Sequence, residues 1–73
     1  MREIQSLARG IQIIDMIVNS NTKVSTTEVA IELDVDKSTA SRLLSTLQTY
    51  DYVQQIAGER GYIAGKRLHR ISW

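Results

Sequence analysis

The feature that most constrains the fold is a three-residue break between two short helical patterns. Residues 26–33 and 37–50 both place apolar side chains at the three- and four-residue spacings of an α-helix. Only Asp34-Val35-Asp36 separates them, which is long enough for a tight turn and nothing more. The apolar Val35 in the middle of this turn is expected to point inward. The sequence therefore predicts two short helices joined by a tight turn.

Both helices begin with a capping signal. Ser25-Thr26-Thr27-Glu28 fits a capping box, in which the first hydroxyl and the last carboxylate satisfy two free amides. Asp36 is expected to cap the second helix, because its charge suits the positive end of the helix dipole. Apolar spacing predicts the buried sides. They are Val29, Ala30 and Leu33 on the first helix, with Ile31 outside, and Ala40, Leu43, Leu44 and Leu47 on the second.

The N-terminal segment predicts a longer amphipathic helix with a wide apolar surface. One stripe consists of Ile4, Leu7, Ile11, Ile14 and Val18. Ser6 is the expected N-cap, and residues 19–21 are the expected stop. Ile13 and Ile17 widen the stripe. Two interpretations stay open for these two residues: the helix is buried on two sides within its own domain, or they form the seam of a dimer.

The C-terminal half predicts a β-hairpin and a short last helix. Residues 52–56 and 62–64 are rich in strand formers, and residues 57–61 carry the glycines and charges of a hairpin tip. Lys23-Val24 is a further brief strand, and residues 66–71 start a last helix. The expected fold is mainly α with a small β-hairpin: a winged helix-turn-helix of three core helices, a two-stranded wing and a short C-terminal helix.

Composition narrows the class of protein. The 73 residues fit one domain. Without cysteine, a disulfide framework and a thiolate metal site are excluded, and no apolar run reaches the roughly 18 residues of a membrane span. With His69 as the only histidine and no acid–base pair, we expect no enzyme, no metal and no cofactor, because Glu28 and Glu32 alone make no convincing metal site. A soluble cytoplasmic protein is expected.

Charge is distributed unevenly along the chain. Residues 1–36 hold three basic and six acidic side chains, whereas residues 37–73 hold six basic and two acidic ones. This asymmetry favours one face that meets phosphate, although ordinary surface charge also explains it.

The outer side of the second helix of the pair has the chemistry of a DNA-reading surface. Arginine is the side chain that most often reads guanine. Small hydroxyl side chains let a helix come close to DNA, although they lower its helix propensity. Hydroxyls at the start of the preceding helix suit phosphate, and Arg60 at the hairpin tip suits a minor groove or phosphate. The candidate DNA-binding residues are Ser25, Thr26, Thr27, Lys37, Ser38, Thr39, Ser41, Arg42, Ser45 and Arg60.

Three alternatives stay open beside DNA binding. The outer side of the helix is also explained as a solvated face, and capping also explains the hydroxyls of residues 25–27. Arg60 is equally able to pair with Glu59 or with nothing. The rival function is a winged helix that binds protein and not DNA, which should expose aromatic or aliphatic anchors on this helix.

Three segments resemble the N-terminal DNA-binding domain of IclR-type bacterial transcription regulators. They are Ile4 to Gly10, Lys37-Ser38-Thr39-Ala40-Ser41-Arg42-Leu43-Leu44 and Gly61-Tyr62-Ile63-Ala64-Gly65. The resemblance covers nearly the whole chain. It implies a repressor or activator that binds a roughly palindromic operator as a homodimer, with the first helix helping dimerisation. It also implies a ligand-sensing C-terminal domain absent from this chain, so we expect a fragment whose small-molecule effector acts only through that domain.

Three aspartates depart from the pattern of that family. The family often has glycine where Asp34 and Asp51 stand, and proline where Asp36 stands. Asp34 and Asp51 both follow a helix end, where a left-handed residue is useful. Aspartate tolerates that conformation better than most residues, so the turns are expected to survive. Asp36 adds a negative charge beside the predicted DNA face.

Overall fold

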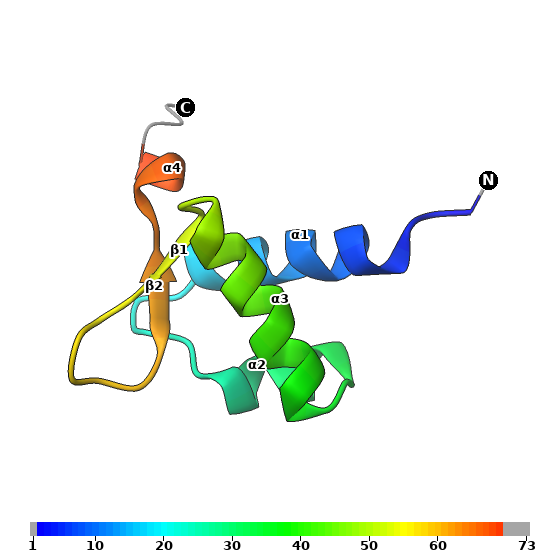
Figure 1. Ribbon diagram of the computed structural model, residues 1–73, viewed down its shortest axis with the longest axis horizontal. Coiled ribbons are helices and arrows are strands. Elements are labelled where there is room, and N and C mark those ends of the chain that lie inside the picture. Colours follow the sequence, from blue (N-terminus) through cyan, green and yellow to red (C-terminus); the bar gives the residue numbers. More distant parts are fainter. Residues whose placement is uncertain (1, 70–73) are drawn as a thin grey trace.

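The computed structural model describes residues 2–69 as three helices, a two-stranded hairpin and a short last helix. The elements are α1 (Gln5–Val18), α2 (Thr26–Leu33), α3 (Lys37–Thr49), β1 (Val53–Gln55), β2 (Tyr62–Ala64) and α4 (Lys66–His69). In Figure 1, α1 and α3 cross, α2 lies near the start of α3, and α4 lies at the opposite end of the hairpin from its tip. The predicted winged helix-turn-helix order is confirmed.

Element bounds differ slightly from the predicted ones. The second helix of the pair ends at Thr49, one residue before the predicted end, and the strand predicted over 52–56 is shorter, Val53–Gln55. The last helix is observed over Lys66–His69, and the remainder of the predicted 66–71 lies outside the described residues. These differences concern ends, where helices and strands fray.

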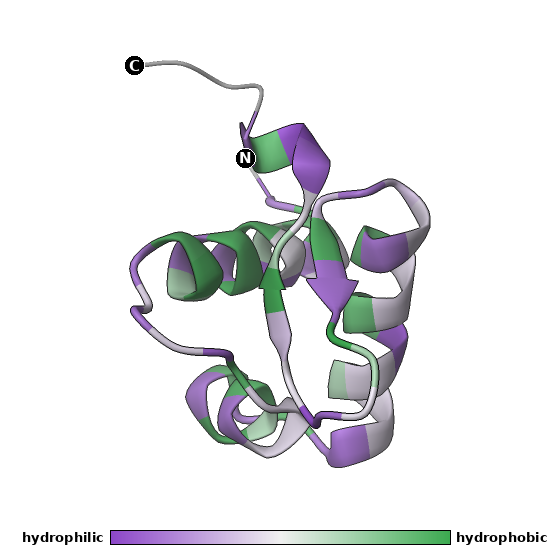
Figure 2. Ribbon diagram, turned by 90° about the vertical axis from the view of Figure 1, so that its left-hand side faces the viewer, coloured by the Kyte–Doolittle hydropathy of each residue, from purple (hydrophilic) through white to green (hydrophobic). Residues whose placement is uncertain are grey.

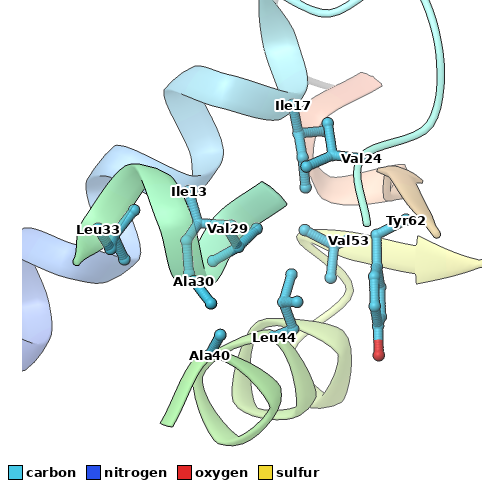
Figure 3. Close-up of a cluster of buried hydrophobic side chains, with 10 residues drawn as sticks. All are labelled: Ile13, Ile17, Val24, Val29, Ala30, Leu33, Ala40, Leu44, Val53 and Tyr62. Carbon is cyan, nitrogen blue, oxygen red and sulfur yellow. The ribbon is translucent and has the colours of Figure 1, made fainter. Parts of the chain in front are cut away.

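A single apolar cluster joins all three long helices to the hairpin (Figure 3). Its buried members are Ile13, Ile17, Val24, Val29, Ala30, Leu33, Ala40, Leu44, Val53 and Tyr62. Full burial of one such aliphatic side chain contributes about 1.5–3 kcal/mol to folding. The predicted inner sides of α2 and α3 are confirmed: Leu43 and Leu47 pack against the cluster half-buried, and Ile31 is 75% exposed.

The buried face of α1 consists of the two residues that were predicted to widen its apolar stripe. Ile13 and Ile17 are 0% and 5% exposed, whereas Ile4, Leu7 and Ile11 are exposed. The N-terminal part of α1 extends past α3 (Figure 1). Within residues 2–69, Leu7 and Ile11 line a groove beside α3 but stay 61% and 52% exposed. The dimer-seam interpretation of Ile13 and Ile17 is therefore wrong, because side chains inside the core offer no surface to a second copy.

The start of α1 also differs from the prediction. Ile4 occupies the N-cap position, without a side-chain cap hydrogen bond, and the helix already includes Ser6. The predicted Ser6 cap is therefore wrong.

The predicted caps of the helix pair are confirmed. The Glu28 amide donates to the Ser25 hydroxyl and the Ser25 amide to the Glu28 carboxylate, both at 3.0 Å. The Thr39 amide donates to the Asp36 carboxylate at 2.9 Å. Val35 packs against the core as predicted. Asp36 caps α3 and Val35 packs into the core, so the turn fixes the start of α3 beside α2.

A bridge attaches the loop between α1 and α2 to the hairpin. Val24 and Tyr62 exchange backbone hydrogen bonds of 2.9 and 2.8 Å, so the predicted brief strand at 23–24 is a single antiparallel bridge. Within the hairpin, Gln55 is paired with Tyr62. The loop, β2 and β1 therefore lie side by side, and the α1–α2 loop is attached to the strand that follows the hairpin tip.

Candidate nucleic-acid interface

A cleft of about 460 Å³ lies between the starts of α2 and α3 and the hairpin. Figure 2 shows the hairpin tip descending between these two helices. The residues that line the cleft are Ser25, Thr26, Thr27, Lys37, Ser38, Ser41, Gln55, Arg60, Gly61 and Tyr62. Three segments that are far apart in sequence thus contribute hydroxyl and basic groups to one concave surface.

The structure places the ten predicted residues around two sides of α3. Seven of them line the cleft. Thr39 and Arg42 lie toward α1 and line an apolar groove between α1 and α3. Ser45 is exposed on α3 outside both hollows. The candidate surface therefore runs from the hairpin tip across α3 to the groove beside α1.

Three residues of the cleft were not predicted from the sequence: Gly61 of the wing tip, and Gln55 and Tyr62 of the strands. Gln55 and Tyr62 meet because the hairpin register pairs them directly, and Tyr62 also forms part of the core at 8% exposure. Strand alternation in the sequence indicates which strand positions share a face, but the register that brings the two together depends on the tertiary pairing.

The start of α2 combines hydroxyls with backbone donors. The capping box uses the amides of Ser25 and Glu28. Helix geometry gives the amides of Thr26 and Thr27 no acceptor within the helix. Amides and hydroxyls of this kind, at the positive end of a helix dipole, bind phosphate oxygens. The capping interpretation and the phosphate interpretation of residues 25–27 are thus compatible.

Carboxylates near the cleft are engaged with other partners. The Lys23 Nζ atom lies 2.7 Å from Glu59 Oε1, so Glu59 pairs with Lys23 and not with Arg60. Among the described residues, no carboxylate lies within 4.0 Å of the charged groups of Lys37, Arg42 or Arg60. These three cations are therefore available to an anionic partner.

Asp36 is the one titratable group with a shifted pKa among the described residues. Hydrogen bonds from the Thr39 side chain and amide, and then from the Ser38 hydroxyl, hold the pKa of the Asp36 carboxyl below its ordinary value of 3.8. The carboxylate is exposed and ionised at neutral pH. The predicted negative charge at the edge of α3 is therefore present.

Neither a metal-binding cluster nor a membrane span occurs within residues 2–69. In that part of the chain, no three His, Cys, Asp or Glu side chains gather where they would hold a metal ion. None of its helices combines the length and the apolar character needed to cross a bilayer.

The fold and the cleft define a class of protein. A tight turn joins α2 to α3, the outer face of α3 is polar and basic, and a hairpin wing stands beside its start. This is the winged helix-turn-helix arrangement of DNA-binding transcription regulators, in which the second helix of the pair reads the groove.

Comparison with known proteins identifies the family. The model of the IclR helix-turn-helix domain matches residues 6–57, so the chain belongs to the IclR family of transcription regulators. The Transcriptional repressor IclR of Escherichia coli K12 and the Acetate operon repressor of Salmonella typhimurium LT2 are each 40% identical to it over 62 residues, which is 85% of this chain and 22% of each relative.

A solved structure agrees with the family assignment. The crystal structure of an IclR family regulator from Brucella abortus superposes with a TM-score of 0.81 and 26% identity, over 93% of this chain and 26% of that one. The chain thus spans about a quarter of the length of the proteins that it matches. The predicted family and fold are confirmed.

Proposed function

We propose that this chain binds double-stranded DNA sequence-specifically, with α3 in the major groove and the tip of the wing, residues 57–61, at the backbone or minor groove. The observation that carries the proposal is the shared cleft, where Arg60 of the wing, Lys37 of α3 and the hydroxyls at the start of α2 line one surface. Membership of a family of transcription regulators supports it independently.

The contacts divide by their chemistry. Arg42 lies on the exposed side of α3 and reads a base edge, because its two parallel donors match the acceptors of guanine. The cleft residues hold phosphate, which positions the helix but carries no base information. Because Ser38, Ser41 and Ser45 are small and exposed, they let the backbone of α3 come close to the floor of the groove.

We infer further that the binding unit is a homodimer on a roughly palindromic operator. The N-cap residue Ile4 and three residues of α1, Leu7, Ile11 and Val18, leave an apolar surface uncovered and are 49–68% exposed. A large exposed apolar patch on a small domain marks an interaction site. A two-fold pair of α3 helices would then read two half-sites, about 34 Å or a multiple of that distance apart.

The protein-binding alternative is not favoured by the chemistry of α3. Every exposed side chain of this helix is polar or basic. A protein-binding surface would instead present aromatic or aliphatic anchors there.

Selection from a random pool of duplexes is the direct test. The chain is expected to enrich a defined motif, and its affinity for the selected duplex should fall steeply as salt rises, because bound phosphates release counterions. The Arg42→Ala variant should lose about 1–3 kcal/mol of binding free energy and relax base preference at one position.

Arg67→Ala is the matched control. Arg67 is an exposed arginine on α4, at the end of the hairpin far from the wing tip (Figure 1). Its replacement should change affinity much less. Equal effects of the two variants, or enrichment of no motif at all, would overturn the proposal.

A further inference from the structure

We propose that Lys23 and Glu59 are positioning residues that hold the wing so that Arg60 reaches DNA. The inference rests on the proposed DNA binding and adds two residues that lie outside the cleft. Lys23 belongs to the loop between α1 and α2, and Glu59 to the wing tip, 36 positions later. Their charged atoms are 2.7 Å apart.

Backbone pairing brings Lys23 to the wing. Its neighbour Val24 is bridged to Tyr62, which follows the wing tip directly. The loop therefore runs antiparallel to the end of the wing. The ion pair adds a second point of attachment, at Glu59 of the wing tip.

Gly61 makes room for the side chain of Lys23. A Cβ atom at Gly61 would lie 3.0–3.1 Å from the Cβ, Cγ and Cδ atoms of Lys23, which is tighter than ordinary van der Waals contact. Gly61 also has φ +123, a conformation that side-chain-bearing residues rarely adopt. The stem of Lys23 thus lies against the glycine and directs its ammonium group to Glu59.

Arg60 lies between the two residues that Lys23 contacts. Glu59 on one side is held by charge and Gly61 on the other by packing, so the backbone on both sides of Arg60 is attached to the same lysine. Arg60 itself lines the cleft with Lys37 and Thr26. Holding its neighbours lowers the conformational entropy that is lost when its side chain binds phosphate.

The pair has a second consequence for charge. An unpaired Glu59 would place a carboxylate next to Arg60 and close to DNA phosphates. Lys23 neutralises it. Because the two side chains are 43% and 49% exposed, the pair is partly screened, and its effect on binding is expected to be about two- to fivefold.

The test measures what Arg60→Ala costs in several backgrounds. The probe is the duplex that the unaltered chain selects from the random pool. The affinity loss caused by Arg60→Ala is measured in the original chain, in Lys23→Met, in Glu59→Ala, in the charge-preserving Lys23→Arg and in the control Glu32→Ala. Met keeps the aliphatic stem over Gly61 and removes the charge, and Glu32 is an exposed carboxylate on α2. Thermal melting checks that each variant is folded.

The positioning role predicts a particular pattern. The loss caused by Arg60→Ala should shrink about two- to fivefold in Lys23→Met and in Glu59→Ala, and stay unchanged in Glu32→Ala and in Lys23→Arg. If the two charges acted only through the overall charge of the chain, each variant would change the affinity for DNA, but the affinity loss caused by Arg60→Ala would be the same in every background. An identical loss in all backgrounds, or no loss in the original chain, overturns the positioning role.

Failure of the two proposals can be distinguished. If the original chain selects a motif and Arg42→Ala weakens binding while the Arg60→Ala loss is constant, only the positioning role is wrong. If the original chain selects no duplex, DNA binding itself is wrong and the positioning role falls with it.

Discussion

Two aspartates hold backbone conformations that glycine adopts more easily. Asp34 ends α2 with φ 55 and ψ 51, and Asp51 follows α3 with φ 68. Both are the positions at which the sequence resemblance implied glycine. Left-handed backbone brings Cβ close to the following carbonyl, at a cost that Asp and Asn reduce but do not remove. The predicted survival of both turns is confirmed.

Asp34→Gly and Asp51→Gly should each raise the free energy of unfolding by up to about 1 kcal/mol, since they relieve this strain. Urea unfolding followed by circular dichroism measures the change. Asp34→Ala is the control and should destabilise, because it keeps Cβ and removes the short polar side chain that makes left-handed backbone less costly. A stability gain in Asp34→Ala equal to that in Asp34→Gly would contradict the strain argument.

The cap at Asp36 makes stability sensitive to acid. Its pKa is lowered in the folded chain by the hydrogen bonds from Thr39 and Ser38, so it binds a proton more readily when unfolded. Its contribution is therefore present above the ordinary value of 3.8 and is lost as pH falls through the lower folded value.

Asp36→Asn should preserve stability at pH 7, because asparagine caps a helix as well as aspartate. The variant should lose less stability than the original chain when unfolding is compared at pH 7 and pH 3. It should also bind the selected duplex more tightly, because one negative charge is removed beside Lys37. Unchanged acid sensitivity would show that Asp36 is not the group responsible.

At the scale of elements, α4 is attached to the end of α3 through a glycine. The Gly65 amide donates to the Tyr52 carbonyl at 2.9 Å, and the Arg67 amide to the Asp51 carbonyl at 3.0 Å. A Cβ at Gly65 would overlap the Asp51 carbonyl oxygen, so the two segments approach as closely as glycine allows. The direction of α4 therefore depends on the turn that ends α3.

Gly65→Ala should lower the free energy of unfolding by about 1–3 kcal/mol, because backbone must shift to admit the methyl group. Gly10→Ala is the matched control. Gly10 lies inside α1, and a Cβ added there would meet nothing within 4 Å, so alanine should stabilise by about 0.5–1 kcal/mol. Thermal melting of the two variants gives the comparison. Stability changes of the same sign in both variants would show that close backbone approach at Gly65 does not exclude a side chain there.

At the scale of the whole molecule, apolar surface is unequally distributed. Ile13 and Ile17 of α1 belong to the buried cluster between the three helices. The other apolar stripe of the same helix, with Leu7, Ile11 and Val18, is exposed. Figure 1 shows the start of α1 extending beyond α3 toward the N-terminus. No residue of this stripe lines the cleft, whereas Leu7 and Ile11 line the groove that also holds Arg42, so a second copy on the stripe would lie beside the Arg42 end of the candidate surface.

Ile11→Glu should convert a self-associating chain into a monomer, since it places a charge in the apolar stripe. Sedimentation at several concentrations measures the change. Ile31→Glu is the control, because Ile31 is an equally large and even more exposed isoleucine, on α2, and its replacement should leave self-association intact. A strictly monomeric original chain at high concentration would exclude α1 as a sufficient dimer surface.

Local signals in the sequence determined the order of elements and most of their faces. The capping box at Ser25, the cap at Asp36 and the inner sides of α2 and α3 all follow from neighbours within four residues along the chain. The polar, basic outer side of α3 follows from the same spacing. Short-range geometry decides these features, so they can be predicted without knowing how the helices pack.

Only the tertiary structure decided which face of α1 is buried and which residues share the cleft. The sequence offers α1 two apolar stripes, and the choice of Ile13 and Ile17 depends on where α2, α3 and β2 lie. The meeting of Gln55 with Tyr62 and of Lys23 with Glu59 likewise depends on pairing between distant segments. Helical spacing constrains neighbours along one element, whereas these contacts depend on the relative placement of several elements, which is set by their packing.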